Sequence, residues 1–420
     1  MTIKFSEKVV YKSISPKDIF AYSPNIYKLK NGRLIVTLDI GGDGVAFVDG
    51  VKGSRANGTK FGQGKIFVSD DDGKNWRFVV NFPFWHARVF EVKNSLYILG
   101  QAGSLKIIKS TDKGDTWSEV FDLTTLEKWH CAPCNILFYK NNLYIEVERR
   151  MNLKVKGWNV AGLSPFLIRC SLSKDLTRSD NWVISEPFTF LDKIHNDEIS
   201  YFGIPFYDIP KYEPLKITES IQCSPMGWLE GNVLKIFDKN HIWYDKNAFH
   251  ILLRTNVGMT NYGAVIKIME LNGKLVPTFE KNPSLKDIAF FPLPGGHLKF
   301  HINYDSVSKF YWMLSNQSTD SMVKPEILEK IPINERRHNL PNNERHRLFL
   351  YFSKNLIDWC PAKPIYASFS EKHSRNYPSF IISENDLYVV VKGADEEGLN
   401  SQYGNIISFF KIENFRNLIY

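Results

Sequence analysis

One eight-residue pattern occurs twice in this chain with the same spacing of Ser, Asp, Gly and Trp. Residues 69–76 read Ser-Asp-Asp-Asp-Gly-Lys-Asn-Trp, and residues 110–117 read Ser-Thr-Asp-Lys-Gly-Asp-Thr-Trp. Strand-like runs precede and follow both copies, so each copy is a predicted hairpin turn. The Ser and Asp side chains can bond the turn backbone, Gly permits a positive φ, and Trp packs onto the sheet. A repeated turn of this kind predicts a fold built from repeated β-hairpins.

Six segments of the form strand, Asn/Asp/Gly turn, strand follow one another along the chain, and helical periodicity is nearly absent. They lie at residues 26–38, 89–99, 136–147, 233–254, 300–314 and 380–391. If each segment is the inner pair of a four-stranded antiparallel blade, the chain is an all-β, six-bladed β-propeller. Residues 1–420 then form a single domain, because no Pro- or Ser-rich linker interrupts the series.

The two ends of the chain and two long insertions complete this interpretation. The last blade ends after its third strand, at residues 406–411, and residues 8–13 resemble an outer strand. We therefore predict that the N-terminal strand completes the last blade and closes the ring. Blades four and five carry insertions near residues 196–213 and 322–347, and the basic stretch 334–347 is predicted to be an exposed excursion.

Composition limits the possible partners. The aromatic content of 14% suits short strands and carbohydrate contact. The net charge of +8 is spread along the chain, without the basic and aromatic run of a nucleic-acid surface. No apolar stretch reaches membrane-spanning length, and the N-terminus lacks the apolar core of a secretory signal. We expect a cytoplasmic protein, or one expressed without its leader.

The five cysteines include Cys131 and Cys134 in a Cys-Ala-Pro-Cys sequence. No second pair of Cys or His at zinc-like spacing accompanies them, so they are interpreted as buried strand residues. Neither a metal nor a cofactor is predicted, and the oligomeric state is left open.

The repeated turn resembles the Asp-box, or BNR repeat, of the sialidase (neuraminidase) superfamily, whose members are six-bladed β-propellers. Residues 110–117 match the pattern at every specified position, and residues 69–76 depart from it only at Asn75. Residues 173–182 and 353–359 look like decayed copies. The resemblance implies the fold, and it leaves function open because non-enzymatic propellers carry the same turn.

In a propeller the innermost strands line the central axis, so residues at their starts converge on one face. This geometry selects residues from all six blades as a candidate pocket: Ser23, Asn25, His86, Arg88, His130, Trp228, Glu230, His297, His301, Arg375 and Tyr377.

Retaining sialidases form a covalent intermediate on a tyrosine that a neighbouring glutamate deprotonates. By resemblance, Tyr377 in Asn-Tyr-Pro-Ser-Phe-Ile is the nucleophile, and Glu230 in Trp-Leu-Glu-Gly is its base. Arg254 and Arg345 look like two of the family's three arginines, whose planar guanidinium groups bind a carboxylate at two points.

Two departures from the family pattern stand out. The aromatic-Arg-Ile-Pro signature of the first blade would fall at residues 22–25, which read Tyr-Ser-Pro-Asn, so the first arginine is missing. Arg88 and Arg375 are the candidates to replace it. Three aspartates compete for the general acid, Asp39, Asp43 and Asp49, and Asp43 is preferred because glycines flank it.

The leading hypothesis is an exo-acting, retaining glycoside hydrolase that acts on a terminal acidic or related sugar of a glycan. Its catalytic residues would be Tyr377, Glu230 and Asp43, and its substrate-binding residues Arg254, Arg345, Arg88, His86, His130, His297 and Arg375. One alternative is a propeller-fold polysaccharide lyase that abstracts a proton beside a uronate carboxylate, using the same histidines, Tyr377 and Arg88. Another is a non-catalytic glycan-binding propeller, which the missing Arg-Ile-Pro sequence favours.

Overall fold

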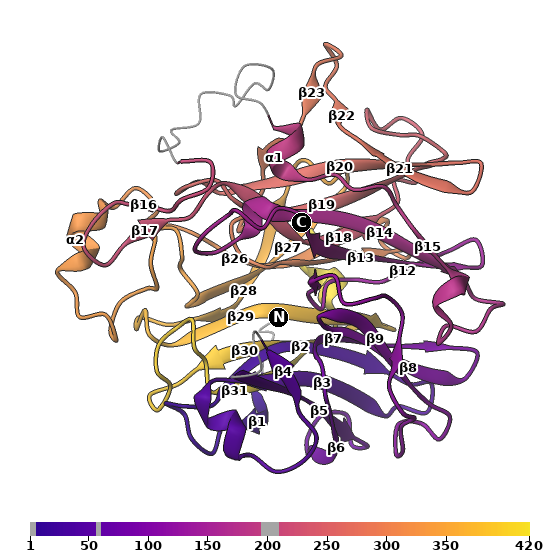
Figure 1. The fold of residues 1–420 in the computed structure, drawn as a ribbon, viewed down its shortest axis with the longest axis horizontal. Coiled ribbons are helices and arrows are strands. Elements are labelled where there is room, and N and C mark those ends of the chain that lie inside the picture. Colours follow the sequence, from indigo (N-terminus) through magenta and orange to yellow (C-terminus); the bar gives the residue numbers. More distant parts are fainter. Residues whose placement is uncertain (1–5, 56–59, 195–209) are drawn as a thin grey trace.

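The computed structural model describes residues 6–55, 60–194 and 210–420. In these residues, antiparallel strands form six main sheets arranged in a ring (Figure 1). The innermost strand of each sheet belongs to one of the six predicted hairpins, and its partners follow outward in chain order. The fold is an all-β six-bladed β-propeller, as the repeated hairpins predict.

The first three blades cover the N-terminal half of the described chain. Blade one contains β2 (Phe20–Lys28), β3 (Leu34–Gly41), β4 (Gly53–Arg55), β5 (Lys60–Ser69) and β6 (Arg77–Phe82). Blade two contains β7 (Trp85–Val92), β8 (Ser95–Ala102), β9 (Ser104–Ser110) and β10 (Phe121–Asp122). Blade three contains β11 (Trp129–His130), β12 (Leu137–Tyr139), β13 (Asn142–Arg150), β14 (Leu163–Ser171) and β15 (Trp182–Ile184).

The last three blades continue the ring. Blade four contains β18 (Gly227–Leu234), β19 (Ala248–Asn256), β20 (Tyr262–Leu271), β21 (Lys274–Thr278) and β24 (Phe290–Pro292). Blade five contains β25 (His301–Asp305), β26 (Phe310–Asn316), β27 (Arg347–Ser353) and β28 (Cys360–Ala367). Blade six contains β29 (Ser374–Ser383), β30 (Asp386–Ala394), β31 (Ile406–Ile412) and β1 (Lys8–Lys12).

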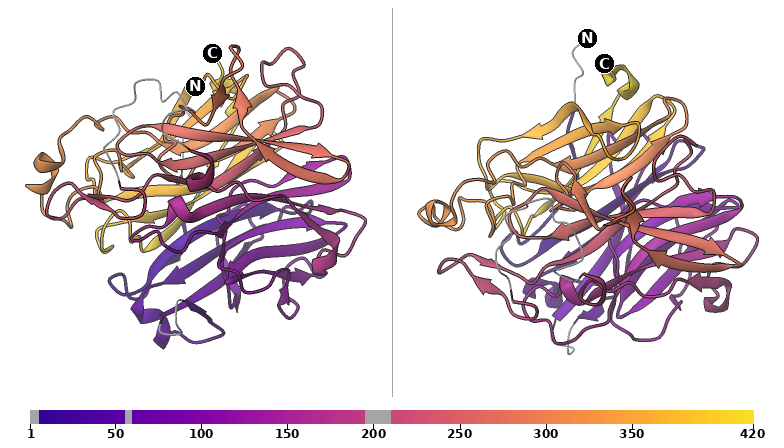
Figure 2. Two further views of the ribbon diagram at one scale, coloured as in Figure 1. Left: turned by 45° about the horizontal axis from the view of Figure 1, so that its top comes forward. Right: turned by 90° about the horizontal axis from the view of Figure 1, so that it is seen from above.

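The N-terminal strand closes the ring as predicted. β1 pairs antiparallel with β31, with Lys8 opposite Phe409. In Figure 1 the indigo β1 lies beside the yellow β31, and Figure 2 shows from two further directions that the last blade returns beside the first. Within β1, Val10 is buried and Val9 is exposed, which is the alternation expected of a strand with one face on the core.

The two repeated turns have the same internal hydrogen bonds. In each, the Ser hydroxyl accepts a hydrogen bond from the Gly N–H at 2.9 Å, and the Asp carboxylate accepts one from the backbone N–H four residues ahead. Gly73 and Gly114 have φ angles of 85° and 90°, in the left-handed region that favours glycine. In the second turn and in both weaker copies, the Trp indole N–H of Trp117, Trp182 and Trp359 donates to a carbonyl of its own turn. These residues stabilise the turns, as the sequence predicts.

Polar side chains link the inner strands of neighbouring blades around the axis. Asn25, Asn135, Asn232 and Asn303 each bond the backbone of the next blade's inner strand, at 2.8–3.3 Å. Arg88 makes the equivalent contact from blade two to a carbonyl of blade three. The Asn25 amide also donates to a hydroxyl of blade six. Buried amides that exchange two hydrogen bonds with the backbone fix the spacing between blades.

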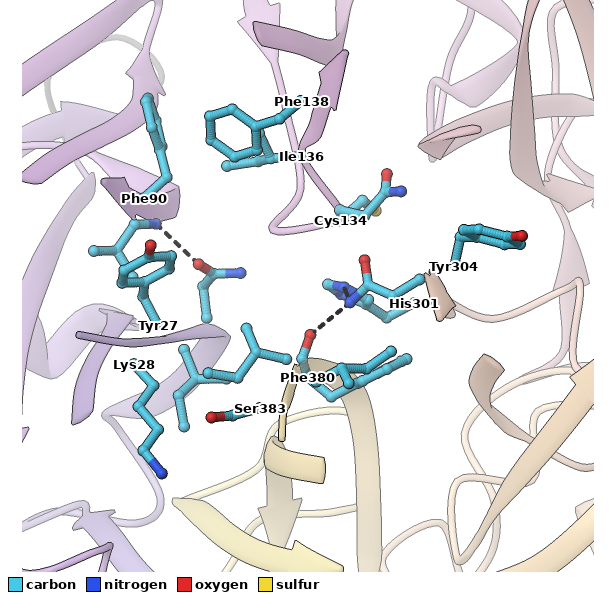
Figure 3. Close-up of a pocket in the computed structure, with 17 residues that line it drawn as sticks. Tyr27, Lys28, Phe90, Cys134, Ile136, Phe138, His301, Tyr304, Phe380 and Ser383 are labelled. Atoms are coloured by element: carbon cyan, nitrogen blue, oxygen red, sulfur yellow. Dashed lines mark hydrogen bonds between the residues drawn. The ribbon is translucent and has the colours of Figure 1, made fainter. Parts of the chain in front are cut away.

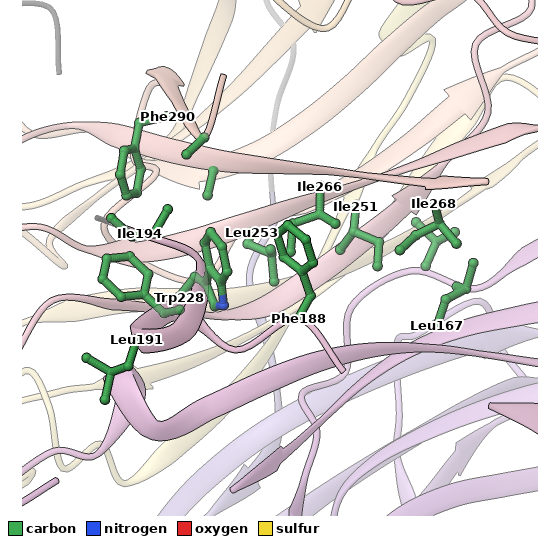
Figure 4. Packing of buried hydrophobic residues seen from close by; sticks show 14 of the residues in the cluster. Leu167, Phe188, Leu191, Ile194, Trp228, Ile251, Leu253, Ile266, Ile268 and Phe290 are labelled. Atoms are coloured by element: carbon green, nitrogen blue, oxygen red, sulfur yellow. The ribbon is translucent and has the colours of Figure 1, made fainter. Parts of the chain in front are cut away.

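Apolar side chains fill the space between adjacent blades. Figure 4 shows one such cluster around Trp228, which is fully buried in β18. The Trp228 indole stacks on Phe188 at 5.9 Å and meets the edge of Phe190 at 5.1 Å between ring centres. Phe190 begins the short helix α1 (Phe190–Lys193), so the connection between blades three and four packs directly on the inner strand of blade four.

Two excursions lie side by side at the left of Figure 1. The small sheet of β16 (Leu215–Lys216) and β17 (Gln222–Cys223) contacts α2 (Pro325–Glu329), where the Glu329 carboxylate accepts hydrogen bonds from Thr218 and Ser220. A second small sheet pairs β22 (Glu280–Lys281) with β23 (Asp287–Ile288). Most of the predicted insertion at 196–213 lies outside the described residues.

The segment 334–347 differs from its prediction. It was expected to be exposed because it is basic, but Arg336, Arg337 and Arg345 are only 2–4% exposed. Arg337 pairs with Glu371 and with Glu344, so carboxylates from this segment and from the connection between blades five and six compensate its buried charge. Arg337 is therefore a structural residue, whereas Arg336 and Arg345 line a cleft that is described below.

Candidate active site

Four inner strands carry the same irregularity at the same end of the ring. β2, β7, β18 and β29 each shift register by a bulge, at Ser23, His86, Glu230 and Tyr377. The φ angles of these four residues are 47°, 55°, 58° and 53°, in a region that non-glycine residues rarely adopt. Such backbone conformations cost on the order of 1–3 kcal/mol each and cluster at functional sites.

All four bulge residues line one pocket of about 200 Å³. The remaining lining residues are Tyr22, His130, Trp158, Leu229, Lys392 and Gln402. A wider cleft of about 630 Å³ adjoins this pocket, shares Trp158 and Gln402 with it, and is also lined by Arg254 and Arg345. The predicted convergence of strand starts is therefore present, and a bulge aims each of the four residues into the pocket.

Tyr377, Glu230 and Arg254 form a closed hydrogen-bonded triangle. The Tyr377 hydroxyl donates to Glu230 Oε1 at 2.5 Å. Arg254 Nη1 donates to Glu230 Oε2 at 2.8 Å and to the Tyr377 Oη at 3.1 Å. Arg254 is itself held by a bond from its Nε to the His297 carbonyl at 2.9 Å. A phenol thus sits directly on a buried carboxylate, in the arrangement a base-activated nucleophile needs.

The electrostatics of the triangle keep the tyrosine protonated and the glutamate ionised. Burial raises the pKa of Tyr377, and the Glu230 charge raises it further. Burial also tends to raise the pKa of Glu230, but the Arg254 guanidinium and the hydrogen bonds from Arg254 and Tyr377 hold that pKa below its ordinary value. The carboxylate is therefore ionised and accepts a hydrogen bond from a protonated phenol.

Local packing places Glu230 in the pocket. In a regular strand Trp228 and Glu230 would point to the same face, but the bulge turns Glu230 to the pocket while Trp228 stays in the core. Gly231 completes the bulge. A Cβ there would lie 2.5 Å from Ile251 and 2.8 Å from the Glu146 carboxyl carbon, so only glycine fits. Across the sheet, Arg254 lies opposite Leu229, which brings its side chain beside Glu230.

Two histidines form another wall of the pocket. The rings of His86 and His130 meet edge to face, with their centres 5.2 Å apart. His130 Nδ1 lies 3.1 Å from Glu148 Oε2. Burial tends to lower the pKa of His130, but the hydrogen bond and charge of Glu148 raise it above its ordinary value. His130 therefore carries a proton under conditions in which an isolated histidine has partly lost it.

A buried acidic pair supports the bulge of β18 from behind. Glu148 also accepts a hydrogen bond from the backbone N–H of Glu230, and Glu146 accepts one from the N–H of Gly231 at 3.0 Å. Burial and the neighbouring Glu148 raise the pKa of Glu146 well above its ordinary value. Arg88 Nη2 lies 3.9 Å from Glu146. These residues position the base and its histidine neighbour without lining the pocket.

Arg345 lies in the wall of the adjoining cleft, next to the nucleophile. Its Nη1 donates to Asn376 Oδ1 and its Nε to Asn343 Oδ1, both at 2.9 Å. Burial and the nearby Arg254 lower the pKa of Arg345 to about 10. Both amide partners are neutral, so the guanidinium charge has no counter-ion from either of them.

The other predicted site residues lie elsewhere. Asp43 has a side chain that is 88% exposed and is 3.8 Å from Lys60, and it does not line the pocket. Arg375 points to Glu7, at 2.6 Å, and to carbonyls of its own blade. Arg88 is completely buried below the pocket.

His297 supports the triangle through its main chain. Its carbonyl holds Arg254, and burial lowers the pKa of its imidazole to about 3, so the ring is neutral. The roles predicted for Asp43, Arg88, His297 and Arg375 stay predictions.

Sequence reasoning missed five residues that line the pocket: Tyr22, Trp158, Leu229, Lys392 and Gln402. Trp158 covers Arg254, with the guanidinium carbon 4.8 Å from its ring centre. Trp158 and Gln402 lie in connections that carry no periodic signal. Lys392 did leave a signal, because it is a lone charge after the apolar run 387–391 of β30. A lysine at a strand position that should be buried is a candidate for a functional group.

A second cavity, of about 350 Å³, lies further along the same inner strands. Figure 3 shows Tyr27, Phe90, Ile136, Tyr304 and Phe380 around it, with hydrogen bonds between inner strands crossing its edge. Its amides belong to the links that hold the blades together, so it is the opposite end of the central channel. Nothing in this cavity resembles the triangle at the strand starts.

In residues 6–55, 60–194 and 210–420, no group of three or more His, Cys, Asp and Glu side chains is arranged to hold a metal ion. Four of the five cysteines are buried, and Cys360 is exposed. Within the same residues, no helix is long and apolar enough to cross a membrane.

No protein-family profile and no curated protein sequence matches this chain. Several solved structures do match it. A protein of unknown function from Dyadobacter fermentans is 12% identical, with a TM-score of 0.54 over 97% of this chain and 98% of that one. Trypanosoma rangeli sialidase is 13% identical, with a TM-score of 0.54 over all of this chain and 61% of that one. A Hadza microbial sialidase is 11% identical, with a TM-score of 0.54 over 97% and 68%. At these identities the likeness shows the fold alone.

Proposed function

We propose that this protein is an exo-acting, retaining glycoside hydrolase with Tyr377 as nucleophile and Glu230 as its base. The observation that carries the proposal is the 2.5 Å hydrogen bond from the Tyr377 hydroxyl to the buried Glu230 carboxylate, in a pocket at the strand starts. The shared fold with sialidases supports a glycan-related role at a coarse level. A pocket of about 200 Å³ suits one terminal sugar, with the rest of the glycan in the adjoining cleft.

In the first step the Tyr377 oxygen bonds to the anomeric carbon, and its proton moves to Glu230 Oε1. The bond from the anomeric carbon to the glycosidic oxygen breaks, and that oxygen takes a proton from a general acid. Arg254 contacts both the base and the phenol oxygen, so it stabilises the charge that develops on that oxygen. The product of this step is a glycosyl-tyrosine.

In the second step a water molecule attacks the anomeric carbon of the glycosyl-tyrosine. The deprotonated general acid takes one proton from the water, and the bond from the anomeric carbon to the Tyr377 oxygen breaks. Glu230 returns its proton to that oxygen, which restores the starting state. Two displacements at one carbon retain the configuration of the sugar.

Asp43 and His130 are the two candidates for the proton donor in this mechanism. Asp43 was predicted for this role, and its exposed side chain does not line the pocket. His130 lines the pocket, and Glu148 keeps it protonated. We therefore propose His130 as the donor to compare with Asp43.

Leaving-group dependence separates the two donors. A variant without the donor is slow on a poor leaving group, such as an alkyl glycoside, and nearly normal on an activated aryl glycoside. We expect this pattern for His130→Gln and an unchanged ratio for Asp43→Asn. The reverse result would assign the role to Asp43.

The protonated His130 also bears on the lyase alternative, in which a neutral histidine would act as the base. Glu148 raises the pKa of His130, which makes that imidazole a proton donor instead. A lyase would release an unsaturated sugar that absorbs ultraviolet light, so the two reactions are distinguishable in one assay.

The proposal is tested by screening the purified protein against aryl glycosides of acidic and neutral sugars and against uronate polysaccharides. Aglycone release that falls at least about 10³-fold in Tyr377→Phe supports it. The control is Tyr351→Phe, which removes another buried phenol hydroxyl in blade five and should keep full activity. Release that survives Tyr377→Phe, or formation of unsaturated product, would contradict the proposal.

A further inference from the structure

Lys392 is a buried lysine that lines the pocket, and burial together with the nearby Arg345 charge holds the pKa of its amine well below the ordinary value. An anion beside the amine would raise that pKa again. Lys392 lies on β30, the second strand of blade six, and only 2% of its surface is exposed. Its amine nitrogen is 4.6 Å from the ring centre of Tyr22 and 5.1 Å from that of Tyr377. Lysine is almost never fully buried unless it is paired. The two aromatic faces attract a protonated amine but do not supply an opposite charge.

Lys392 and Arg345 meet at the residue that precedes the nucleophile. Asn376 lies directly opposite Lys392 in the pairing of β29 with β30. Arg345 donates its Nη1 to the amide oxygen of the same Asn376. Two basic side chains from different blades are therefore anchored next to Tyr377.

Neither basic side chain has a protein counter-ion. In the described part of the chain, no carboxylate lies within 4.0 Å of Lys392 or of Arg345. The charged groups that face Lys392 are Arg345 and Asp39, followed by Glu230 and Arg254. Glu230 forms an ion pair with Arg254 at 2.8 Å, so its negative charge is balanced by Arg254 and not by Lys392. The wall beside Tyr377 thus carries a guanidinium and an amine that have no carboxylate of the described residues in contact with them.

We propose that Lys392 acts with Arg345 to bind a carboxylate on the reacting sugar, and that Lys392 is the residue that selects acidic over neutral sugars. This inference rests on the proposed function only in taking the bound sugar to be the one that reacts, and the binding of the carboxylate can be tested by itself. A ligand carboxylate would supply the anion that both buried basic side chains lack. The planar guanidinium of Arg345 can offer two parallel donors, and the Lys392 ammonium adds a point charge.

The tyrosine nucleophile fits this inference. A carboxylate nucleophile beside a substrate carboxylate would repel it, whereas the hydroxyl of Tyr377 is neutral until its proton moves to Glu230. Of the residues predicted to replace the missing first arginine, Arg88 and Arg375 both point away from the pocket. The first arginine was expected in residues 22–25, and the Lys392 amine lies over the ring of Tyr22 in that segment.

The test measures binding of two acidic monosaccharides, glucuronate and N-acetylneuraminate, by titration calorimetry. Their methyl esters are matched controls, because they have the same shape and lack the charge. We expect at least one acid to bind at least about tenfold tighter than its ester, and Lys392→Met to remove that preference while leaving ester binding unchanged. Lys392→Arg should retain most of it. Equal loss for acid and ester, no loss, or no binding of either acid at millimolar concentration would overturn the inference.

Thermal melting shows whether Lys392→Met merely damages the fold. Because it removes a buried amine that no carboxylate of the described residues contacts, this variant should melt at the same temperature as the unchanged protein or higher. It should also lose the stabilisation that the acid gives. Lys235→Met is the matched control. Lys235 is equally buried, but its ammonium donates to three backbone carbonyls, so its loss should lower the melting temperature and leave acid binding intact. A fall in melting temperature for Lys392→Met, as large as that for Lys235→Met, would make Lys392 structural.

The binding test and the activity screen can fail separately. Acid binding that depends on Lys392 in a protein without hydrolase activity would keep this inference and end the proposed function. Hydrolysis of neutral glycosides that is unaffected by Lys392→Met would do the opposite. A sulfated monosaccharide that binds through Lys392 more tightly than either carboxylate would move the assignment from a carboxylate to a sulfate ester.

Discussion

At the scale of single residues, the proposed nucleophile depends on three side chains, those of Tyr377, Glu230 and Arg254. In the proposed mechanism Tyr377 supplies the oxygen and Glu230 accepts its proton, while Arg254 contacts both and lowers the pKa of Glu230. Each of these roles depends on burial, because in water the phenol and the carboxylate would bond to solvent instead. Two further residues beside Tyr377, Arg345 and Lys392, are proposed to bind a carboxylate of the substrate.

Glu230→Gln tests the base. The amide has nearly the same shape but cannot accept the proton, and it leaves the Arg254 charge unpaired. We expect kcat/KM to fall by about 10²–10⁴-fold, with the larger effect on kcat. Steady-state kinetics on the best aryl glycoside measure this fall. An effect confined to KM would show that Glu230 only binds substrate.

The pH profile of kcat/KM reports the free enzyme. The pKa of Glu230 is held below 4.5, so the acid limb should lie below that pH. The pKa of His130 is raised above 6.5 by Glu148, so a donor His130 places the basic limb above 6.5. His86, Glu230 and Arg254 also face His130.

Glu148→Gln should move the basic limb to lower pH by removing the charge that raises the pKa of His130. The acid limb should stay in place. A basic limb that does not move in this variant would exclude His130 as the proton donor.

At the scale of elements, the site depends on the bulges in β2, β7, β18 and β29, which no sequence pattern predicted. The sequence predicted that strand starts would converge, and Glu230 and Tyr377 both line the pocket that forms there. Nothing in the sequence indicated that both residues have positive φ angles, because such conformations are imposed by tertiary packing on side chains that do not favour them. The prediction that Arg345 is exposed was wrong for a similar reason. A basic loop is expected to be exposed unless the residues that pack against it from elsewhere in the chain are known.

The polar links between inner strands give a prediction about stability. Asn135 is buried and exchanges two hydrogen bonds with the backbone of Val233 in the next blade, each at 2.8 Å. Asn135→Ala leaves a buried N–H and C=O unpaired, so it should lower the free energy of unfolding by about 2–4 kcal/mol. Urea denaturation measures the change. Asn247→Ala, at an exposed turn position, is the control and should change it by less than about 0.5 kcal/mol.

At the scale of the whole molecule, the fold was largely predictable. Each of the six predicted hairpins is the inner pair of a blade, and the N-terminal strand closes the last one. Repetition made this possible, because each hairpin carries its own turn signal and the ring follows from their number. The contributions of Trp158 and Gln402 could not be predicted, because their positions depend on how separate connections fold over the pocket.

Ring closure can be tested within β1 itself. Val10 is 5% exposed and packs into the cluster between blades six and one, whereas the adjacent Val9 is 51% exposed. Val10→Asp buries an unpaired charge and should lower the free energy of unfolding by about 3 kcal/mol or more. Val9→Asp should have little effect. Equal effects of the two substitutions in a thermal melt would show that β1 does not close the ring in solution.

The central claim is that Tyr377 forms a covalent bond to the sugar. Activated fluorosugars, in which a fluorine beside the anomeric carbon slows hydrolysis of the intermediate, can be offered as a panel of acidic and neutral sugars. Mass spectrometry of the digested protein then locates the added mass. A glycosyl group on the peptide that contains Tyr377, absent from Tyr377→Phe, is the predicted result. A label on Glu230 or another carboxylate, together with full turnover by Tyr377→Phe, would contradict the claim.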